Sequence, residues 1–406
     1  MPTYKYNVVD QYGKEITGMQ DASDKSTLVA FLHDQNFTVV NIEEKINFFG
    51  ELMAFGVSRV SLKSKVVFAK QLSTMLSAGL PITQALEIII QQTDDKSLEK
   101  NLQLVLDDIQ KSGRPLSDSM KQHTKIFNEV QINLVKAGET SGNLNEVLVK
   151  VADDLQKTKL LVSKIKGAMI YPAIVFIVIA VVMIVMVVYM IPAVQGLYAD
   201  FGISELPGPT AFLVEINKFI TNPLGAISTV VVVGSIIMGF NFYRSTTSGR
   251  LVTDKLTLKI PVFGNLIEKM QILQFCRLFS MLLRSGVPII DSINIVASAL
   301  NNVLFINSLR KAVDDISKGI PLAIPLSRSQ VFPPLIVRMV AIGEETGKLD
   351  KVLEDMAVFY EEEVNEISEN LNKLMEPMIL VVVGGLVAFL AIAIYLPIYS
   401  IGNSLA

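Results

Sequence analysis

Three long stretches of the chain contain no charged side chain. The first lies between Lys166 and Asp200, the second runs from Phe219 to Tyr243, and the third runs from Pro377 to the end of the sequence. Each holds an almost wholly apolar core: residues 170–191, 224–243 and 378–399. A helix of about 20 apolar residues crosses the ~30 Å hydrocarbon core of a bilayer. The pattern therefore predicts three transmembrane helices.

Elsewhere the apolar positions recur with helical spacing. Leu144, Leu148, Val151 and Leu155 follow one another at intervals of 4, 3 and 4 residues, which places them on one face of a helix. Breaks are expected where a Gly ends one helix and a Pro opens the next, and at Gly138. The first soluble region then contains about six helices, near residues 60–78, 81–92, 95–111, 115–122, 127–137 and 143–166.

The pattern of residues 68–192 returns at residues 275–397. Both copies share a signature, which is Phe68, Gly79 and Pro81 in the first and Phe275, Gly286 and Pro288 in the second. The buried stripe returns as Leu349, Leu353, Met356 and Tyr360. Agreement over such a length indicates a duplicated domain. Four prolines in matching places, Pro172, Pro192, Pro377 and Pro397, are interpreted as the ends of the membrane segments, where a membrane helix tolerates Pro best.

The N-terminal segment is predicted to be a small separate module. Residues 4–9 alternate in polarity, turn near Gly13 and resume at Glu15, which indicates a β-hairpin. A helix over residues 24–35 and a third strand over residues 37–42 follow. An amphipathic linker comes next, and it either packs on the first bundle or lies on the membrane surface.

The predicted fold is a mainly all-α integral membrane protein with two homologous six-helix bundles and a small N-terminal α/β module. The expected parts are the α/β module (1–46), the linker (47–60), the first bundle (61–166), a transmembrane helix (170–191), an external loop (193–219), a second transmembrane helix (224–243), the second bundle (245–373) and a third transmembrane helix (378–399). The middle span has no counterpart in the repeat. It carries the chain back across the membrane, so both bundles are expected on the same side.

Basic residues set the predicted orientation. Four lysines precede the first span and four basic residues follow the second, whereas the segment between these spans holds Asp200, Glu205 and Glu215 against Lys218 alone. Because basic residues accumulate on the cytoplasmic side, the N-terminus and both bundles are expected in the cytoplasm, and the C-terminus outside. No apolar run typical of a signal peptide occurs in the first 46 residues.

A Gly-Glu-x-x-Gly turn is the sharpest local motif in each copy. Its candidate residues are Gly138, Glu139 and Gly142 in the first copy and Gly343, Glu344, Glu345 and Gly347 in the second. One interpretation is structural: Gly138 and Gly343 adopt a left-handed conformation, the Glu serves the next helix, and Asn143 with Glu146 forms a capping pair. The other is that the Glu side chains contact a partner. The glycine spacing does not fit a phosphate-binding loop.

Other chemistry is scarce. The formal net charge of −3 gives no support for nucleic-acid binding, and His33 and His123 lie in different modules. We therefore predict no catalytic residue, no metal site and no cofactor. The lone Cys276 aligns with Ala69 and is interpreted as a small core residue. The acidic run at residues 361–369 is either a solvated helix face or a docking site for a basic partner. Uncharged spans argue against a transporter, which stays a remote alternative together with a signalling protein.

The repeated signature, the Gly-Glu-x-x-Gly turns and the proline-flanked spans together resemble the inner-membrane platform proteins of type IV pilus assembly and type II secretion. The resemblance covers nearly the whole chain, including the N-terminal hairpin. It implies a scaffold that is not an enzyme, that binds a hexameric cytoplasmic ATPase, and that moves pilin or pseudopilin subunits into a fibre. It further implies other inner-membrane assembly proteins as partners, and a homo-oligomer. Pilus assembly is favoured, and the equivalent platform of a type II secretion system is the alternative.

Overall fold

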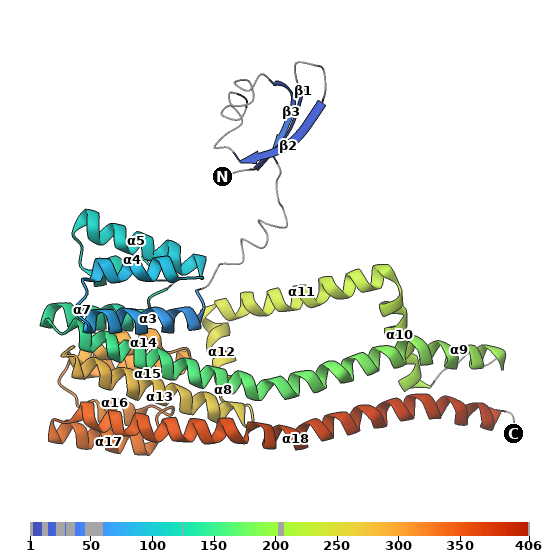
Figure 1. Cartoon of the computed structure of the whole chain (residues 1–406). Helices are drawn as coiled ribbons and strands as arrows, with labels where there is room; N and C mark the ends of the chain where they lie inside the picture. Colours follow the sequence, from blue (N-terminus) through green and yellow to red (C-terminus); the bar gives the residue numbers. More distant parts are fainter. Residues whose placement is uncertain are drawn as a thin grey trace. The chain divides into compact units, whose positions relative to one another are not determined.

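The computed structural model describes residues 3–9, 15–21, 29, 37–44, 60–124, 126–201 and 207–404. It divides into two units, Met1–Val60 and Ser61–Ala406. The first unit contains a three-stranded antiparallel sheet in the order β2-β1-β3, drawn in dark blue in Figure 1. Its strands are β1 (Thr3–Val9), β2 (Glu15–Asp21) and β3 (Thr38–Glu44). The predicted hairpin and third strand are thereby confirmed. The helix predicted over residues 24–35 and the linker lie almost wholly outside the described residues.

The second unit begins with six helices whose boundaries agree with the predicted ones to within a few residues, except at Gly138 and at the end of α8, which was predicted at residue 166 but lies at Val185. They are α3 (Leu62–Ser77), α4 (Ile82–Gln92), α5 (Lys96–Ser112), α6 (Leu116–Lys121), α7 (Glu129–Ser141) and α8 (Leu144–Val185). Gly79 and Gly113 take positive φ angles of 84° and 61°, and a proline starts the next helix two residues later. Gly adopts this conformation without the steric cost that a Cβ atom brings.

The same six-helix order returns in the second copy, preceded by one additional helix. The additional helix is α12 (Thr247–Thr257), and the six are α13 (Phe263–Arg284), α14 (Ile289–Ala299), α15 (Val303–Ile316), α16 (Ala323–Arg328), α17 (Pro334–Thr346) and α18 (Leu349–Ser404). Phe332 packs against Phe275 and Phe305 with ring centroids 5.0 and 5.3 Å apart. In the first copy the corresponding pair is Phe68 and Phe127, at 5.9 Å. The signature phenylalanines are therefore core residues.

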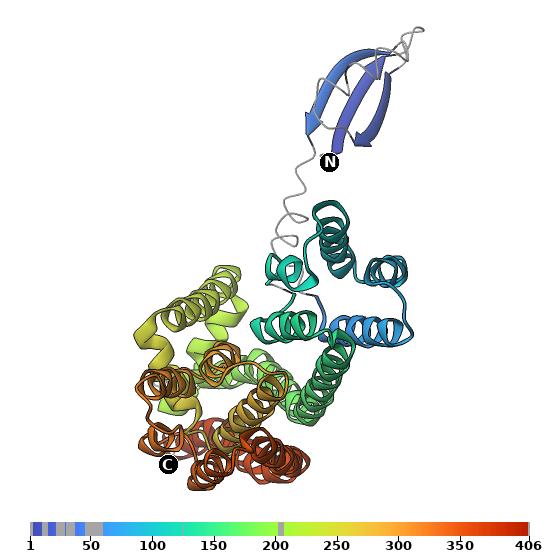
Figure 2. The same ribbon diagram turned by 90° about the vertical axis from the view of Figure 1, so that its left-hand side faces the viewer.

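Two helices continue from the bundles into the apolar segments without a break. α8 passes through Pro172 and is extended by a π-helical turn, η1 (Met186–Met190), and by α9 (Ile191–Asp200). α18 passes through Pro377 and Pro397. Figures 1 and 2 show α8 and α18 running side by side in the second unit.

Both long helices have the length and composition of membrane spans. The two candidates are Leu144–Asp200 and Leu349–Tyr399, and only 11% and 22% of their most apolar windows are buried inside the protein. A core helix of a soluble protein would be mostly buried instead. These surfaces are therefore suited to contact with lipid.

The residues between the first two apolar segments are largely helical. Residues 193–219 were predicted to be a loop, but the structure places α9 and α10 (Gly208–Thr221) there. α10 packs Leu213 and Val214 against Val187, Leu390 and other residues of the long helices, which stabilises it as a helix. α11 (Pro223–Ser245) then covers the predicted middle span.

Candidate functional site

The Gly-Glu-x-x-Gly motif ends α7 and α17, and its second glycine is the left-handed one. Gly142 and Gly347 have φ angles of 74° and 66° and are the residues at which the two helices stop. The prediction that Gly138 and Gly343 adopt this conformation was wrong, because the helices continue through them for one more turn. Each motif holds two glycines four residues apart, and the local sequence does not show which of them ends the helix.

The first glycine of each motif allows two helices to approach closely. A Cβ atom on Gly138 would lie 3.1 Å from the Cα of Leu144 and from the side chain of Val147. A Cβ atom on Gly343 would lie 2.9 Å from the Cα of Leu349, closer than real Cβ contacts. A Cβ atom at Gly343 would force a backbone shift between α17 and α18, and one at Gly138 would require a smaller adjustment between α7 and α8. The motif thus sets the packing at the base of α8 and α18.

The glutamate of the first motif caps a helix that precedes it in the sequence. The carboxylate of Glu139 accepts a hydrogen bond of 2.6 Å from the backbone N–H of Leu116 and one of 3.3 Å from that of Ser117. The Ser117 hydroxyl donates to the same carboxylate. The residue before α6, Pro115, offers no side chain that could cap the helix. A negative charge at a helix N-terminus interacts favourably with the helix dipole and its unpaired N–H groups.

The second copy repeats this arrangement. Glu344 accepts hydrogen bonds of 2.6 Å from the N–H of Leu322 and 2.9 Å from the N–H of Ala323, at the start of α16. The prediction that these glutamates serve the following helix was therefore wrong. Asn143 makes no capping hydrogen bond through its side chain, so the capping pair with Glu146 was wrong as well. The sequence gives no signal for this cap, because its donors lie more than 20 residues earlier.

Charged side chains join the two copies along α8 and α18. Lys157 lies 3.6 Å from Glu361, and Lys164 lies 2.8 Å from Glu369 and 3.1 Å from the side-chain oxygen of Asn365. Lys164 lies eight residues before Pro172, and Glu369 lies eight residues before Pro377. The two residues therefore occupy matching positions of the repeat. The duplicated helices therefore lie in register, with opposite charges facing each other.

The acidic run at residues 361–369 thus pairs with basic residues of the same chain. Lys269 adds a third partner, 2.7 Å from Glu363. Glu362, Glu366 and Glu369 are exposed, as on a solvated helix face. The ion pairs are internal to the chain, so docking to a basic partner stays a prediction. The sequence alone could not identify these partners, because they lie in the other copy or on a different helix.

Arg277 of α13 is the most buried cation of this interface. Its side chain is only 14% exposed, and its guanidinium lies 3.1 Å from Glu361 and 3.7 Å from Asp154. Burial raises the pKa of the Asp154 carboxyl, and the positive charge of Arg277 opposes that rise. Exposed pairs such as Lys164–Glu369 contribute little to stability, whereas removing one partner of a buried pair costs about 3–5 kcal/mol. Arg277 therefore dominates the electrostatic link between the bundles.

A groove with a volume of about 240 Å³ accompanies this interface. It is lined by α8, α13 and α18, with Lys150, Asp153, Arg277 and Arg284 among its charged residues. Four acidic and four basic side chains line it, so it carries no strong net charge. Among the described residues, no group of three or more His, Cys, Asp or Glu side chains could hold a metal ion.

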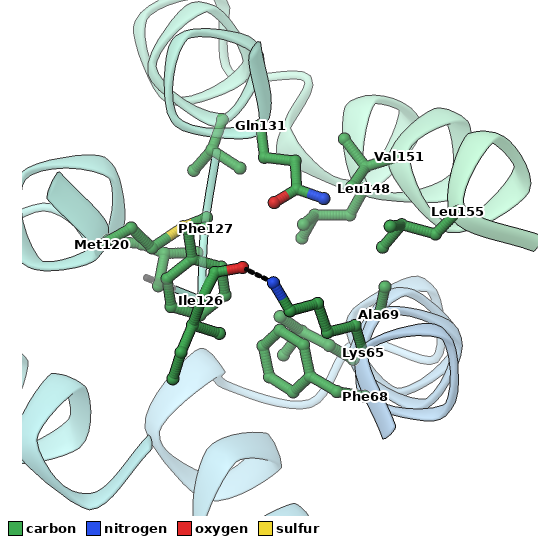
Figure 3. Close-up of a pocket in the computed structure, with 13 residues that line it drawn as sticks. Lys65, Phe68, Ala69, Met120, Ile126, Phe127, Gln131, Leu148, Val151 and Leu155 are labelled. Carbon is green, nitrogen blue, oxygen red and sulfur yellow. Dashed lines mark hydrogen bonds between the residues drawn. The ribbon is translucent and has the colours of Figure 1, made fainter. Parts of the chain in front are cut away.

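The first bundle contains a small apolar cavity, shown in Figure 3. Its volume is about 20 Å³, which is room for about one water molecule. The ammonium group of Lys65 enters this cavity and donates a hydrogen bond to the carbonyl of Ile126. Burial lowers the pKa of Lys65. Ile272, which matches Lys65 in the second copy, is fully buried, so the cavity is a variation in core packing.

Cys276 is fully buried in the second bundle, and burial raises the pKa of its thiol. Both properties agree with its interpretation as a small core residue, since reactive cysteines are exposed and have lowered pKa values. Of the three motif glutamates, Glu345 is the exposed one. It is the motif glutamate whose side chain takes part in no helix cap described above.

Comparison with known proteins accounts for the duplication. The family model described as Type II secretion system (T2SS), protein F, matches residues 68–192 and again residues 275–397. A second model, for the N-terminal domain of the same proteins, matches residues 1–43. The chain belongs to the type II secretion system protein F family. The two matches coincide with the repeat found in the sequence, which confirms the duplicated domain and the resemblance to this family.

Several members of the protein F family resemble the chain over most of its length. The type IV pilus assembly protein PilC of Thermus thermophilus is 34% identical over 409 residues, covering all of both chains. PilC of Pseudomonas aeruginosa is 36% identical over 86% of this chain and 94% of its own. The type II secretion system protein F of Xanthomonas campestris is 27% identical over all of both chains.

Proposed function

We propose that the chain is the inner-membrane platform protein of a type IV pilus assembly machine. The observation that carries this proposal is the full-length match to type IV pilus assembly proteins PilC, at 34% identity for the Thermus thermophilus protein. Relatives named for type II secretion match the same length at 27% identity or less. The platform of a type II secretion system is therefore the second candidate.

The proposed topology has three spans, with the N-terminus and both bundles in the cytoplasm. The first span is residues 170–191 in α8 and η1, the second is residues 224–243 in α11, and the third is residues 378–399 in α18. Arg244, at the end of α11, and Arg250, in α12, supply positive charge on the proposed cytoplasmic side. They also lie 3.9 and 3.8 Å from the buried carboxylate of Asp254. Asp254 accepts a hydrogen bond from the N–H of Val303, which ties the end of α11 to the second bundle.

The proposed role is mechanical and not catalytic. Each bundle shares one continuous helix with the membrane, α8 in the first copy and α18 in the second. The glycine contacts fix α7 on α8 and α17 on α18, and the ion pairs fix α8 beside α18. A displacement of the bundles by a cytoplasmic hexameric ATPase would therefore be transmitted to the membrane segments, where pilin subunits reside before assembly.

The surface that meets the ATPase is proposed to lie on the bundles. The carboxylates of Glu139 and Glu344 are engaged by backbone N–H groups, which leaves the exposed Glu345 as the more accessible partner contact of the motif. Other inner-membrane assembly proteins and a second copy of the chain are further proposed partners.

Deletion of the gene from its host separates the two candidate functions. For a pilus platform, the deletion removes surface fibres, the wild-type gene on a plasmid restores them, and extracellular enzymes are secreted at the normal level. Loss of secretion with intact fibres would instead support the type II secretion platform. Normal fibres together with normal secretion would contradict both.

A further inference from the structure

α10 has one buried face and one exposed side. The buried face consists of Thr210, Leu213, Val214 and Asn217. On the exposed side, Phe212 and Phe219 expose 59% and 54% of their surface. Glu215 follows Phe212 by three residues and precedes Phe219 by four, so it lies between the two rings, and it forms an ion pair with Lys218 at 2.9 Å. A helix that contacts only water on its outer side does not need two exposed phenylalanines on one face.

The buried face of α10 packs against the two long helices inside their apolar segments. Leu213 and Val214 form one cluster with residues of η1, α9 and α18, which are Val187, Ile191, Leu390 and Ala393. All four lie within residues 170–191 and 378–399, the segments without charge. α10 therefore sits at the level of the membrane-spanning parts and not beyond them.

A hydroxyl of α10 satisfies a backbone carbonyl that a proline leaves without its usual partner. In an α-helix the carbonyl of Ala393 would accept from the N–H of residue 397, but Pro397 has no N–H. The hydroxyl of Thr210 donates to that carbonyl instead, at 2.7 Å. In addition, the Tyr198 hydroxyl donates to the carbonyl of Pro397 itself, at 3.0 Å.

A side-chain amide of α10 satisfies a backbone carbonyl freed by the matching proline of the first copy. In the π-helical turn η1, each carbonyl pairs with the N–H five residues ahead. For Val187 that residue is Pro192, which again has no N–H. The side-chain amide of Asn217 donates to the Val187 carbonyl at 2.6 Å. Polar side chains from a neighbouring helix are a known way to satisfy backbone groups freed by Pro inside a bilayer.

The exposed phenylalanines continue the apolar surface of the long helices. The ring of Phe212 packs edge to face on Phe389 of α18, with centroids 6.5 Å apart. Tyr395 and Tyr399 of the same helix are 69% and 76% exposed. Aromatic side chains are typical of the boundary between the acyl chains and the head groups. The apolar surface of α18 therefore extends to Phe212 of α10.

We propose that α10 is a membrane-inserted helix: it contacts lipid acyl chains through Phe212 and Phe219 and joins the two long spans at Pro192 and Pro397. Because Glu215 lies between the two rings, the proposed position of α10 is the boundary between acyl chains and head groups, where the Glu215–Lys218 pair reaches the water. The proposal rests on the membrane location of the proposed function, but not on the choice between pilus and secretion. It gives the external segment a structural role that its sequence, predicted as a loop, does not indicate.

Quenching by lipid tests the contact directly. Single cysteines are introduced as Phe212→Cys, Phe219→Cys and Lys218→Cys in the full chain with Cys276→Ala, since Ala69 occupies the matching position in the first copy. Each is labelled with an environment-sensitive fluorophore and reconstituted into liposomes of phosphatidylcholine, with or without brominated acyl chains. Labels at positions 212 and 219 should emit at shorter wavelength and lose most of their emission with brominated lipid, whereas the label at 218 should do neither.

This experiment distinguishes failure of the α10 proposal from failure of the membrane location. If the protein sediments with the liposomes but the labels at 212 and 219 behave like the label at 218, the insertion of α10 is refuted and the membrane location stands. If the protein does not associate with liposomes at all, the membrane location itself fails, and α10 cannot be inserted. Neither outcome depends on pilus components, because only lipid and this chain are present.

The link to the prolines is tested by removing the two polar groups of α10. The variant Thr210→Val with Asn217→Leu keeps the size of both side chains. Thr221→Val is the matched control, because the Thr221 hydroxyl bonds only the carbonyl of Asn217 within α10. In nanodiscs, amide hydrogen exchange of α10 should be on the order of tenfold faster in the double variant and unchanged in the control. Wild-type exchange in the double variant would refute the role of these hydrogen bonds.

Discussion

Substitution of Glu344 by Gln tests the assignment of the motif glutamate as a helix cap. The carboxylate accepts hydrogen bonds from the N–H groups of Leu322 and Ala323. A Gln side chain retains one acceptor oxygen, while its NH₂ group faces the second N–H and cannot accept from it. A hydrogen bond to a charged acceptor contributes ~1.5–3 kcal/mol. We therefore expect α16 to lose about 2 kcal/mol of local stability.

Hydrogen exchange followed by mass spectrometry measures this loss in the full chain. A difference of about 2 kcal/mol corresponds to roughly 30-fold faster exchange of the α16 amides. Glu345→Gln is the matched control, because Glu345 is the neighbouring residue and is exposed. Equal exchange in the wild-type protein and in Glu344→Gln would refute the cap. If Glu344→Gln bound less ATPase although the α16 amides exchanged at the wild-type rate, the carboxylate would be a partner contact and not a cap.

Three further predictions concern packing, charge and topology. Gly343→Ala should lower the thermal unfolding midpoint, because its Cβ atom would lie 2.9 Å from backbone and overpacking costs ~1–3 kcal/mol. The control Gly384→Ala should leave the midpoint unchanged, because a Cβ atom there has no neighbour within 4 Å. Equal midpoints for the two variants would contradict the close contact. Burial lowers the pKa of Lys65 in the folded state, so the free energy of unfolding should rise as pH increases towards 10.5. Lys65→Met should remove this rise. The same pH dependence of stability in the variant and in the wild-type protein would contradict this assignment. With Cys276 replaced by Ala, an impermeant thiol reagent applied to intact cells should label Lys218→Cys and not Lys318→Cys; labelling of both or of the second alone would contradict the topology.

The sequence was sufficient to predict the helices and the repeat because both depend on local signals. Gly-x-Pro breaks such as Gly79 with Pro81 end helices through backbone geometry, and the buried stripe is visible in residue spacing. The same signals reappear in the second copy at an offset that changes only from 207 to 205 residues. They required no knowledge of contacts between distant residues.

The features that could not be predicted all depend on distant contacts. The helix passes through Gly138 because that residue packs on Leu144, whereas the local sequence fits a helix end equally well. Thr210 and Asn217 resemble loop residues until their acceptors in the long helices are known. Arg277 gives no signal in the sequence because its partners lie on α8 and α18. In each case the missing information is which helices are neighbours.

The central claim is that the chain transmits work from a separate ATPase and performs no hydrolysis itself. The most direct measurement is the affinity of the purified, liposome-reconstituted protein for its assembly ATPase in the presence of ADP and of a non-hydrolysable ATP analogue. A partner bound equally in all nucleotide states transmits no work. The account predicts that the two affinities differ and that the chain alone releases no phosphate from ATP. Equal affinities in both states, or hydrolysis of ATP by the chain alone, would contradict it.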